Sequence, residues 1–287
     1  MINIYGKEIN IKNYDCSSDG INYKKLPFPM ITLYVQVINR CNAKCSFCDF
    51  GKVSNTFNYE KFENMLKEIT KKVYLSKICI TGGEPLLDIN RTINVIKIAK
   101  KYSRKIVLNT NTFSVERLKM VYPYVDEIDI SRHHYDECIH KSILKTEVAS
   151  LEEIAKIDVE QKITINCVMQ KGRIDSYDEV MKFINHIAEN NIKSIKFISL
   201  LPLTKEAETE YVNPSNIIEE CKKYTNSGML YDHHMCNCFE FIYLSDTGNV
   251  VKATMRNTTD SCYSCVKQLV FNGENLFDGF KKETKII

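Results

Sequence analysis

The sequence predicts an α/β fold: a partial, open (β/α)6 barrel or a doubly wound sheet, followed by a small C-terminal α+β domain. Six apolar stretches rich in β-branched residues alternate with amphipathic helical stretches between residues 31 and 205. Strands that alternate with helices pair in parallel through helical crossovers. Six units are too few for a closed eight-stranded barrel. After residue 205 the alternation gives way to a predicted β-hairpin.

Each predicted strand is a short apolar run, and a helix with one apolar face follows it. The strands are predicted at residues 30–38, 77–83, 105–110, 125–131, 162–170 and 192–203. The helices are predicted at residues 58–72, 89–102, 115–121, 151–157 and 176–191. Loops gather at the carboxyl ends of parallel strands, so we expect the functional site there.

The chain is predicted to divide into three parts. Residues 1–30 form an N-terminal extension, residues 31–205 the barrel and residues 206–287 a second domain. In the second domain a helix is predicted to begin near Asn213, because a proline suits the first turn. Residues 239–255 are predicted to form a β-hairpin, because two alternating runs flank a turn rich in turn-forming residues.

The composition is that of an ordinary globular protein. Apolar residues make up 44% and charged residues 26%, and the formal net charge is +3. So small a charge does not favour nucleic acid or an acidic membrane surface as a partner. No stretch has the length of a membrane span, and the first thirty residues lack the apolar run of a signal peptide. We therefore expect a cytoplasmic protein.

The twelve cysteines indicate metal binding. A disulfide framework is not expected, because the cytosol keeps thiols reduced. Seven cysteines fall into two groups: Cys41, Cys45 and Cys48, then Cys236, Cys238, Cys262 and Cys265. The other five are scattered, and a free cysteine usually packs as a small buried apolar residue: Cys16, Cys79, Cys138, Cys167 and Cys221.

The first group offers three thiols within eight residues and no fourth nearby. A cubane iron–sulfur cluster normally takes four thiolates, so three leave one iron with open coordination sites. A metal acts on a bound ligand at such an open site. Phe47, which precedes Cys48, is expected to shield the cluster from water. Zinc with a distant fourth ligand is the alternative.

The spacing C-x3-C-x2-C, with an aromatic residue before the last cysteine, resembles the radical S-adenosylmethionine (radical SAM) superfamily. The segment TGGEP is similar to the family's segment that receives the SAM amino group, and it contains Gly82, Gly83, Glu84 and Pro85. Glycines permit close approach of the backbone to a ligand, and a carboxylate can accept from an ammonium.

The resemblance implies a partial TIM-like barrel, a [4Fe–4S] cluster whose open iron chelates SAM, and an external electron donor such as flavodoxin or ferredoxin. It also implies that SAM is cleaved reductively to a 5′-deoxyadenosyl radical, which takes a hydrogen atom from the substrate.

Three further strand ends carry the resemblance. Ser131 ends the fourth strand, where family members often contact the SAM ribose. The fifth and sixth strands are similar to those of the enzyme that cyclises GTP in molybdenum-cofactor biosynthesis, which places Asn166 and Ser199 at the SAM site. Ordinary strand-end hydrogen bonding is the alternative for all three. We do not carry over GTP cyclisation, because the chain offers few arginines for bidentate triphosphate binding.

The second cysteine group flanks the predicted hairpin. Its spacing suits either a zinc ribbon or an iron–sulfur site. Beside a radical SAM barrel it resembles the twitch or SPASM-like auxiliary-cluster domain, which implies a second [4Fe–4S] cluster. Cys238 and Gly248 fit the twitch pattern, but Ala253 stands where that pattern has its closing cysteine. Cys236 could replace it.

The loop after the fourth strand carries the predicted substrate contacts. Loops at this face usually determine specificity. The candidate residues combine hydrogen-bond donors with a titratable group: Arg132, His133, His134 and Tyr135. Such a polar set favours a hydroxyl- or charge-bearing small molecule over a lipid. A ribosomally made peptide is the alternative substrate.

The outcome of the radical chemistry stays open between epimerisation, dehydrogenation and rearrangement. In an epimerisation a thiol returns a hydrogen atom to the substrate, and Cys167 and Cys138 are the candidate donors. In an oxidation the auxiliary cluster accepts an electron. A protein of another class, an iron–sulfur electron carrier or a zinc-stabilised interaction module, is the competing hypothesis.

Overall fold

In the part of the chain that the structure describes, eleven strands form one sheet. Their order is β13-β12-β3-β4-β5-β6-β7-β8-β11-β10-β9. The computed structural model describes residues 1–11, 28–48, 56–201, 203–224, 229–233, 238–245, 247–257, 267–280 and 284–287. Four cysteines lie outside these ranges: Cys16, Cys236, Cys262 and Cys265.

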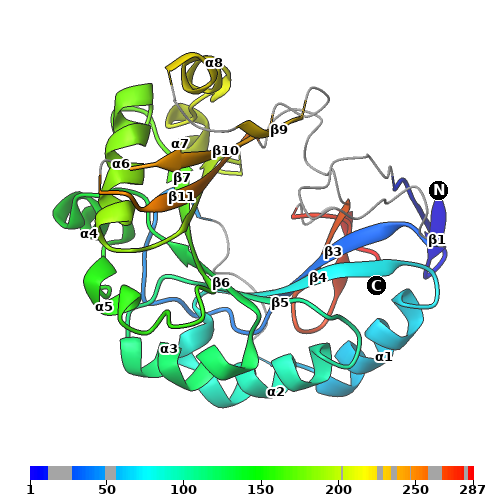
Figure 1. Ribbon diagram of the computed structural model, residues 1–287. Coiled ribbons are helices and arrows are strands. Elements are labelled where there is room, and N and C mark those ends of the chain that lie inside the picture. Colours follow the sequence, from blue (N-terminus) through cyan, green and yellow to red (C-terminus); the bar gives the residue numbers. More distant parts are fainter. Residues whose placement is uncertain are drawn as a thin grey trace.

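Six consecutive parallel strands form the middle of the sheet, as predicted. They are β3 (Met30–Gln36), β4 (Tyr74–Thr81), β5 (Ile106–Thr110), β6 (Glu127–Ser131), β7 (Ile163–Met169) and β8 (Ser194–Ser199). Each pairs in parallel with the next. The sheet curves into an open barrel with helices on its convex side (Figure 1). The predicted α/β class and the partial barrel are therefore confirmed.

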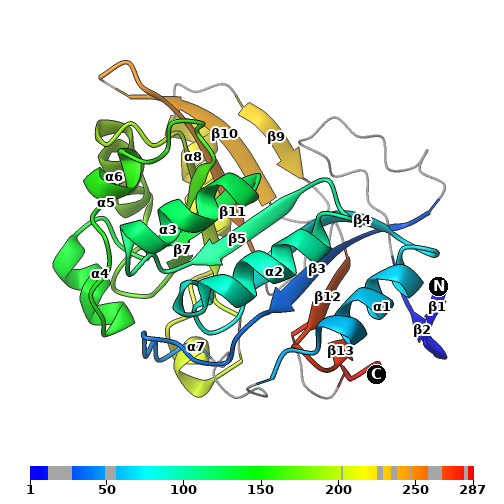
Figure 2. The same ribbon diagram turned by 90° about the horizontal axis from the view of Figure 1, so that it is seen from below.

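The described part of the chain contains eight α-helices, most of which cover the outer face of the sheet (Figure 1). They are α1 (Tyr59–Ile69), α2 (Ile89–Ala99), α3 (Val115–Val121), α4 (Glu137–Leu144), α5 (Leu151–Ala155), α6 (Tyr177–Glu189), α7 (Lys205–Thr209) and α8 (Ser215–Tyr224). In Figure 2, α1, α2 and α3 lie in succession along β3, β4 and β5. A polar side chain accepts a backbone hydrogen bond at most helix starts, for example Asn58 at α1 and Ser176 at α6. Such caps satisfy otherwise unpaired N–H groups.

Side chains alternate between two faces along each strand. On β7, Ile165 and Cys167 belong to the apolar core under the helices, whereas Asn166 lines a pocket inside the barrel. The same alternation sets Asp129 of β6 and Lys196 of β8 on the inner face, where their side chains form an ion pair of 2.7 Å. The outer face therefore holds the core, and the inner face carries polar and charged groups.

Strands that follow the predicted barrel extend both edges of its sheet. β10 (Cys238–Leu244) and β11 (Val250–Arg256) form the predicted antiparallel hairpin, with β9 (Met229–His233) beside β10. β11 pairs in parallel with β8. At the other edge β12 (Lys267–Phe271) pairs in parallel with β3 and carries β13 (Leu276–Phe277). These additions cover edges that would otherwise expose unpaired backbone groups.

The sheet is thus continuous across the predicted boundary at residue 205, and the division into domains stays a prediction. At the N-terminus, β1 (Ile2–Ile4) and β2 (Lys7–Ile9) form a separate hairpin. Two short 3-10 helices, η2 (Pro85–Leu87) and η3 (Tyr122–Tyr124), follow β4 and α3. Among the described residues, no helix combines the length and the apolar character needed to cross a membrane.

Candidate functional site

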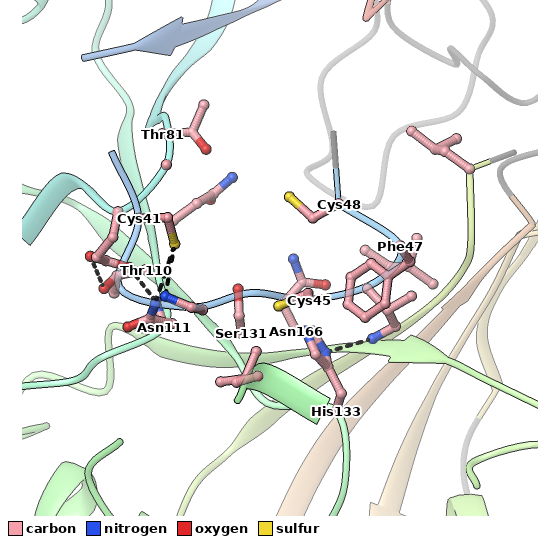
Figure 3. Close-up of a pocket in the computed structure, with 18 of the residues that line it drawn as sticks. Cys41, Cys45, Phe47, Cys48, Thr81, Thr110, Asn111, Ser131, His133 and Asn166 are labelled. Carbon is pink, nitrogen blue, oxygen red and sulfur yellow. Dashed lines mark hydrogen bonds between the residues drawn. The ribbon is translucent and has the colours of Figure 1, made fainter. Parts of the chain in front are cut away.

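A pocket of about 300 Å³ lies at the carboxyl ends of the parallel strands (Figure 3). Most of the predicted cluster- and SAM-binding residues line it. They are Cys41, Cys45, Phe47, Cys48, Gly82, Gly83, Glu84, Ser131, Asn166 and Ser199. They come from β3, β4, β6, β7 and β8 or from the loops that follow, because parallel strands end at the same edge of a sheet. Pro85 is buried behind them as the first residue of η2.

The three cysteines of the first group sit on the loop after β3. Cys41 and Cys48 are exposed and Cys45 is half-buried. The backbone N–H of Lys44 donates to the carbonyl of Leu144 at 2.8 Å, which anchors this loop to the end of α4. The surrounding protein removes part of the water from around both thiols, although Cys41 stays exposed as a residue, and this raises the pKa of Cys41 to about 11 and that of Cys45 to about 12. A metal would therefore have to displace protons from thiols that are neutral at pH 7.

These thiols line one pocket without forming a closed metal site. Among the described residues, no three His, Cys, Asp or Glu side chains converge at the spacing of metal ligands. Phe47 packs edge-on against His133 with 5.4 Å between the ring centroids, and both residues line the pocket. The predicted role of Phe47 in shielding a cluster from water stays a prediction.

The glycines of the TGGEP segment permit contact with the cysteine loop. Gly83 N–H donates to Ile38 O at 2.7 Å, and Glu84 N–H donates to Arg40 O at 2.9 Å. A Cβ at Gly82 would lie 2.4 Å from Ile38 O, and one at Gly83 would lie 2.1 Å from Arg40 O. Only glycine allows so close a backbone approach. The TGGEP segment therefore packs directly against the start of the cysteine loop.

Glu84 is buried and accepts three hydrogen bonds from the protein. Its Oε1 accepts from Leu86 N–H at 2.9 Å and from the Thr110 hydroxyl at 2.7 Å. Its Oε2 accepts from Asn111 N–H at 2.8 Å. Burial raises the pKa of Glu84 to about 7, although these hydrogen bonds oppose the shift. The carboxylate thus joins η2 to the turn after β5, and its predicted contact with an ammonium stays a prediction.

The end of β5 and the turn after it contribute pocket residues that were not predicted from the sequence: Asn109, Thr110 and Asn111. Asn111 Nδ2 donates to Asn42 Oδ1 at 2.9 Å and lies 4.0 Å from Cys41 Sγ. A dashed line marks the contact between Asn111 and Cys41 in Figure 3. Thr112, which follows, is buried with φ +55°, a strained conformation for a β-branched residue. The polar run NTNT at the end of a predicted strand was the signal that could have identified this turn.

Two buried amide oxygens of the pocket have no hydrogen-bond partner among the described residues. They are Oδ1 of Asn109 and Oδ1 of Asn166. A buried acceptor without a partner costs about 1–3 kcal/mol. A ligand with N–H or O–H donors would remove that cost, so the pocket suits such a ligand.

Of the predicted substrate residues, His133 alone lines this pocket. Its Nδ1 accepts from Val168 N–H at 3.2 Å, which leaves Nε2 as the protonated nitrogen of the neutral ring. Burial lowers the pKa of His133 to about 4. The ring is therefore neutral at pH 7, with one N–H available as a donor.

The other three substrate candidates make contacts within the protein. The Arg132 guanidinium is buried and forms an ion pair with Glu137 at 3.1 Å. His134 Nδ1 accepts from Asp136 N–H at 2.9 Å. Tyr135 donates its hydroxyl to Glu179 at 2.8 Å. None of the three lines the pocket, so their substrate roles stay predictions without support from their placement.

The two candidate hydrogen-atom donors also lie away from the pocket. Cys167 is on the helix side of β7, fully buried in the apolar core, and Cys138 is exposed on α4. Adjacent residues of a strand face opposite sides, so Cys167 cannot point where Asn166 points. Cys79, by contrast, shares a hydrogen bond with Tyr34, and Tyr34 lines the pocket.

The second cysteine group falls mostly outside the described residues, at Cys236, Cys262 and Cys265. Cys238 is described: it is buried on β10, opposite Arg256 of β11. Ala253, at the position without a cysteine, packs in the core on the other face of β11. The ligand set of an auxiliary cluster stays a prediction.

Comparison with known proteins shows the family and agrees with the fold. The model of the Radical SAM superfamily matches residues 35–212. GTP 3′,8-cyclase of Lactiplantibacillus plantarum is 24% identical over 69% of this chain and 62% of its own length. GTP 3′,8-cyclase of Clostridium botulinum is 31% identical over 66% of this chain and 63% of its own length. The chain thus spans less than two thirds of these curated relatives.

Solved structures share the fold. Streptococcus suis SuiB bound to S-adenosylmethionine superposes with a TM-score of 0.55 at 20% identity, over 70% of this chain and 48% of that chain. The same protein bound to precursor peptide SuiA superposes with a TM-score of 0.53 at 19% identity, over 70% of this chain and 46% of that chain. The family match covers more than half of the chain and coincides with the three-cysteine pocket. The chain belongs to the radical SAM superfamily.

Proposed function

We propose that this chain holds a [4Fe–4S] cluster through Cys41, Cys45 and Cys48, binds SAM beside it and takes a hydrogen atom from a polar small-molecule substrate. The supporting observation is that these three thiols share one pocket with two buried, unpaired amide oxygens. Three thiols leave one iron open. SAM carries an ammonium, an adenine amino group and ribose hydroxyls, which are donors that such oxygens need. The residues that line the pocket therefore suit both a [4Fe–4S] cluster and SAM.

When bound and reduced, the cluster supplies the electron that cleaves SAM and releases a 5′-deoxyadenosyl radical. The chain's own residues hold the surroundings in place. Phe47 and His133 pack together and cover one side of the pocket. Asn111 directs its amide at Cys41. Ser131 and Ser199 add hydroxyl groups at two strand ends.

A second [4Fe–4S] cluster is part of the proposal, with Cys236, Cys238, Cys262 and Cys265 as its ligands. The burial of Cys238 on the inner face of β10 favours a site inside the molecule. With four thiolates this cluster would be closed and would carry electrons. The twitch-like character of the C-terminal region, the supply of electrons by flavodoxin or ferredoxin and a non-lipid substrate belong to the same proposal.

The substrate class divides into two candidates. The relatives named GTP 3′,8-cyclase make GTP the first small molecule to test. A ribosomally made peptide is the second candidate, because SuiB, which shares the fold, binds a precursor peptide. Epimerisation, dehydrogenation and rearrangement all begin with the same hydrogen abstraction and differ only in how the substrate radical is resolved.

Release of 5′-deoxyadenosine from SAM tests the proposal. The full chain is reconstituted anaerobically with iron and sulfide, reduced with dithionite and compared with a variant carrying Cys41→Ala, Cys45→Ala and Cys48→Ala. We expect about eight irons in the parent, about four in the variant and nucleoside from the parent alone. A parent that loads iron but releases no nucleoside, with GTP present or absent, contradicts the proposal. Stoichiometric zinc and a colourless protein would support the zinc module instead.

A further inference from the structure

Among the residues that the structure describes, the inner face of the barrel carries more positive than negative side chains. Residues that pair across neighbouring strands share a face, and Arg256 of β11 pairs with Ile198 of β8, which lines the pocket. Thr254, two residues earlier, pairs with Lys196. Side chains alternate between the two faces along each strand, so strand pairing identifies the inward-facing residues of every strand around the barrel. Within the described ranges, the charged groups on this face and at the amino-terminal ends of its strands are Lys77, Lys105, Lys196, Lys252, Arg256, Glu127, Asp129 and Glu240.

Each carboxylate of this set has a cationic partner. Lys196 lies 2.6 Å from Glu127 and 2.7 Å from Asp129. Lys105 also contacts Glu127, at 2.6 Å. Lys252 lies 3.2 Å from Glu240. The three acids are therefore neutralised within the barrel.

Two of the five cations have no such partner. Within the described ranges, no carboxylate lies at ion-pair distance from the Arg256 guanidinium or from the Lys77 ammonium. Arg256 is exposed although it sits at the inner face of the sheet. An arginine stays protonated at any ordinary pH. A permanent, accessible cation therefore faces the inside of the barrel.

The neighbours of Arg256 place it beside the pocket. The groups close enough to act on its charge include Cys238 and Glu240 of β10, and Tyr34 and Asp129 from across the barrel. Tyr34 lines the pocket from β3, and its ring packs against Phe280 with 4.9 Å between centroids. Arg256 does not itself line the pocket, but it pairs with the pocket-lining Ile198 and lies close enough to the pocket-lining Tyr34 for their charges to interact.

We propose that Arg256 binds an anionic group of the substrate, a carboxylate or a phosphate, inside the barrel next to the three-cysteine pocket. The inference rests on the proposed function, because it concerns the substrate of that same site. A guanidinium offers a planar fork of N–H donors that matches two oxygens of either group.

Binding of simple anions tests the proposal without knowledge of the substrate. Isothermal titration calorimetry is run on the anaerobically reconstituted full chain with pyrophosphate and, separately, with succinate. The variants are Arg256→Gln, which removes the charge, and Arg256→Lys, which keeps the charge and loses the fork. Arg104→Gln is the matched control, because Arg104 is exposed in the loop before β5, at the opposite end of the strands.

We expect one of the two anions to bind the parent and to bind Arg256→Gln about tenfold more weakly or worse, since a charge-assisted hydrogen bond is lost. The affinity of Arg256→Lys for the anion is expected to lie between those of the parent and Arg256→Gln. The affinity of Arg104→Gln is expected to equal that of the parent. Preference for pyrophosphate assigns a phosphate to the substrate, and preference for succinate assigns a carboxylate. Equal binding of both anions by the parent and by Arg256→Gln, or no binding of either anion by the folded parent, overturns the inference.

The same preparation separates this inference from the proposed function. If the parent binds an anion through Arg256 but releases no 5′-deoxyadenosine from SAM, the anion site stands and the proposed function fails. If the parent releases nucleoside but its anion binding does not depend on Arg256, the inference fails and the proposed function stands. Thermal melting of Arg256→Lys and Arg256→Gln checks that both variants are folded.

Discussion

The Glu84 carboxylate accepts a hydrogen bond from the backbone N–H of Asn111 at 2.8 Å and so joins two loops of the pocket. The backbone of Glu84 is in turn bonded to Arg40, directly before Cys41. Three loops that follow three different strands are therefore linked through one residue. A change at Glu84 should reach the cysteine loop and the Asn111 turn together.

Glu84→Gln should remove a pH dependence of stability. Burial raises the pKa of Glu84 to about 7 from 4.5, so between these values the folded state holds a proton that the unfolded state releases. The contribution of this raised pKa to the free energy of unfolding is fully present below pH 4.5 and is lost as the pH rises through about 7. The full shift corresponds to roughly 3 kcal/mol. Urea denaturation at pH 5 and pH 8 measures it.

The relevant quantity is the difference between parent and variant, because other groups titrate in the same range. We expect the free energy of unfolding of the parent to fall more between the two pH values than that of Glu84→Gln. Equal changes in both proteins would show that Glu84 has an ordinary pKa.

Gly83→Ala should displace the cysteine loop. Its Cβ would lie 2.1 Å from Arg40 O, so the backbone of one loop must move. We expect a loss of stability of about 3 kcal/mol, as for other strongly overpacked sites, and a loss of bound iron. Gly172→Ala is the control, because its Cβ would meet nothing within 4 Å although its φ is +76°. That variant should lose only about 1–2 kcal/mol from backbone strain and keep its iron. Full iron content in Gly83→Ala would contradict the prediction.

Asn111→Ala should lower the reduction potential of the first cluster. The amide lies 4.0 Å from Cys41 Sγ, and donors near cluster sulfurs stabilise the reduced state. Loss of a hydrogen bond worth up to about 1 kcal/mol corresponds to a shift of at most about 40 mV for one electron. Redox titration followed by EPR measures it. Asn64→Ala on the exposed side of α1 is the control, and an unchanged potential in both variants would refute the role of Asn111.

Lys196→Met should destabilise the barrel by about 3 kcal/mol, because it leaves two largely buried carboxylates without their shared cation. Burial opposes ionisation of Glu127, but Lys196 and Lys105 outweigh it and hold its pKa well below the ordinary value. Lys71→Met is the matched control, since its pair with Glu68 is exposed and should contribute less than about 1 kcal/mol. Denaturation curves for both variants provide the test, and equal effects would count against the buried network.

The six barrel strands and their parallel pairing could be predicted because the signals are local. Apolar runs alternate with amphipathic helices from β3 to β8, and that alternation already requires a parallel sheet. The pairing of β12 with β3 could not be predicted in this way. Residues Lys267–Phe271 form a five-residue strand, and their partner lies near the other end of the chain. No local pattern encodes such a pairing.

The loops that line the pocket could be predicted from sequence motifs, but the packing of individual side chains could not. The cysteines and TGGEP follow strands β3 and β4, so their convergence followed from topology. The polar side chains of the segment from Arg132 to Tyr135 suggested a loop that contacts the substrate. In the structure Arg132 and His134 are buried, and an ion pair and a hydrogen bond within the protein satisfy their polar groups. Strand alternation was an available signal for Cys167: its neighbour Asn166 faces the pocket, so Cys167 had to face the helices.

The most direct test of the account is the EPR spectrum of the reduced, reconstituted chain with and without SAM. The central claim is that Cys41, Cys45 and Cys48 hold a cluster with an open iron that SAM occupies. We predict that SAM changes the spectrum of the parent and leaves the spectrum of the variant without these three cysteines unchanged. An identical parent spectrum in both conditions, with the cluster fully loaded, would contradict the claim.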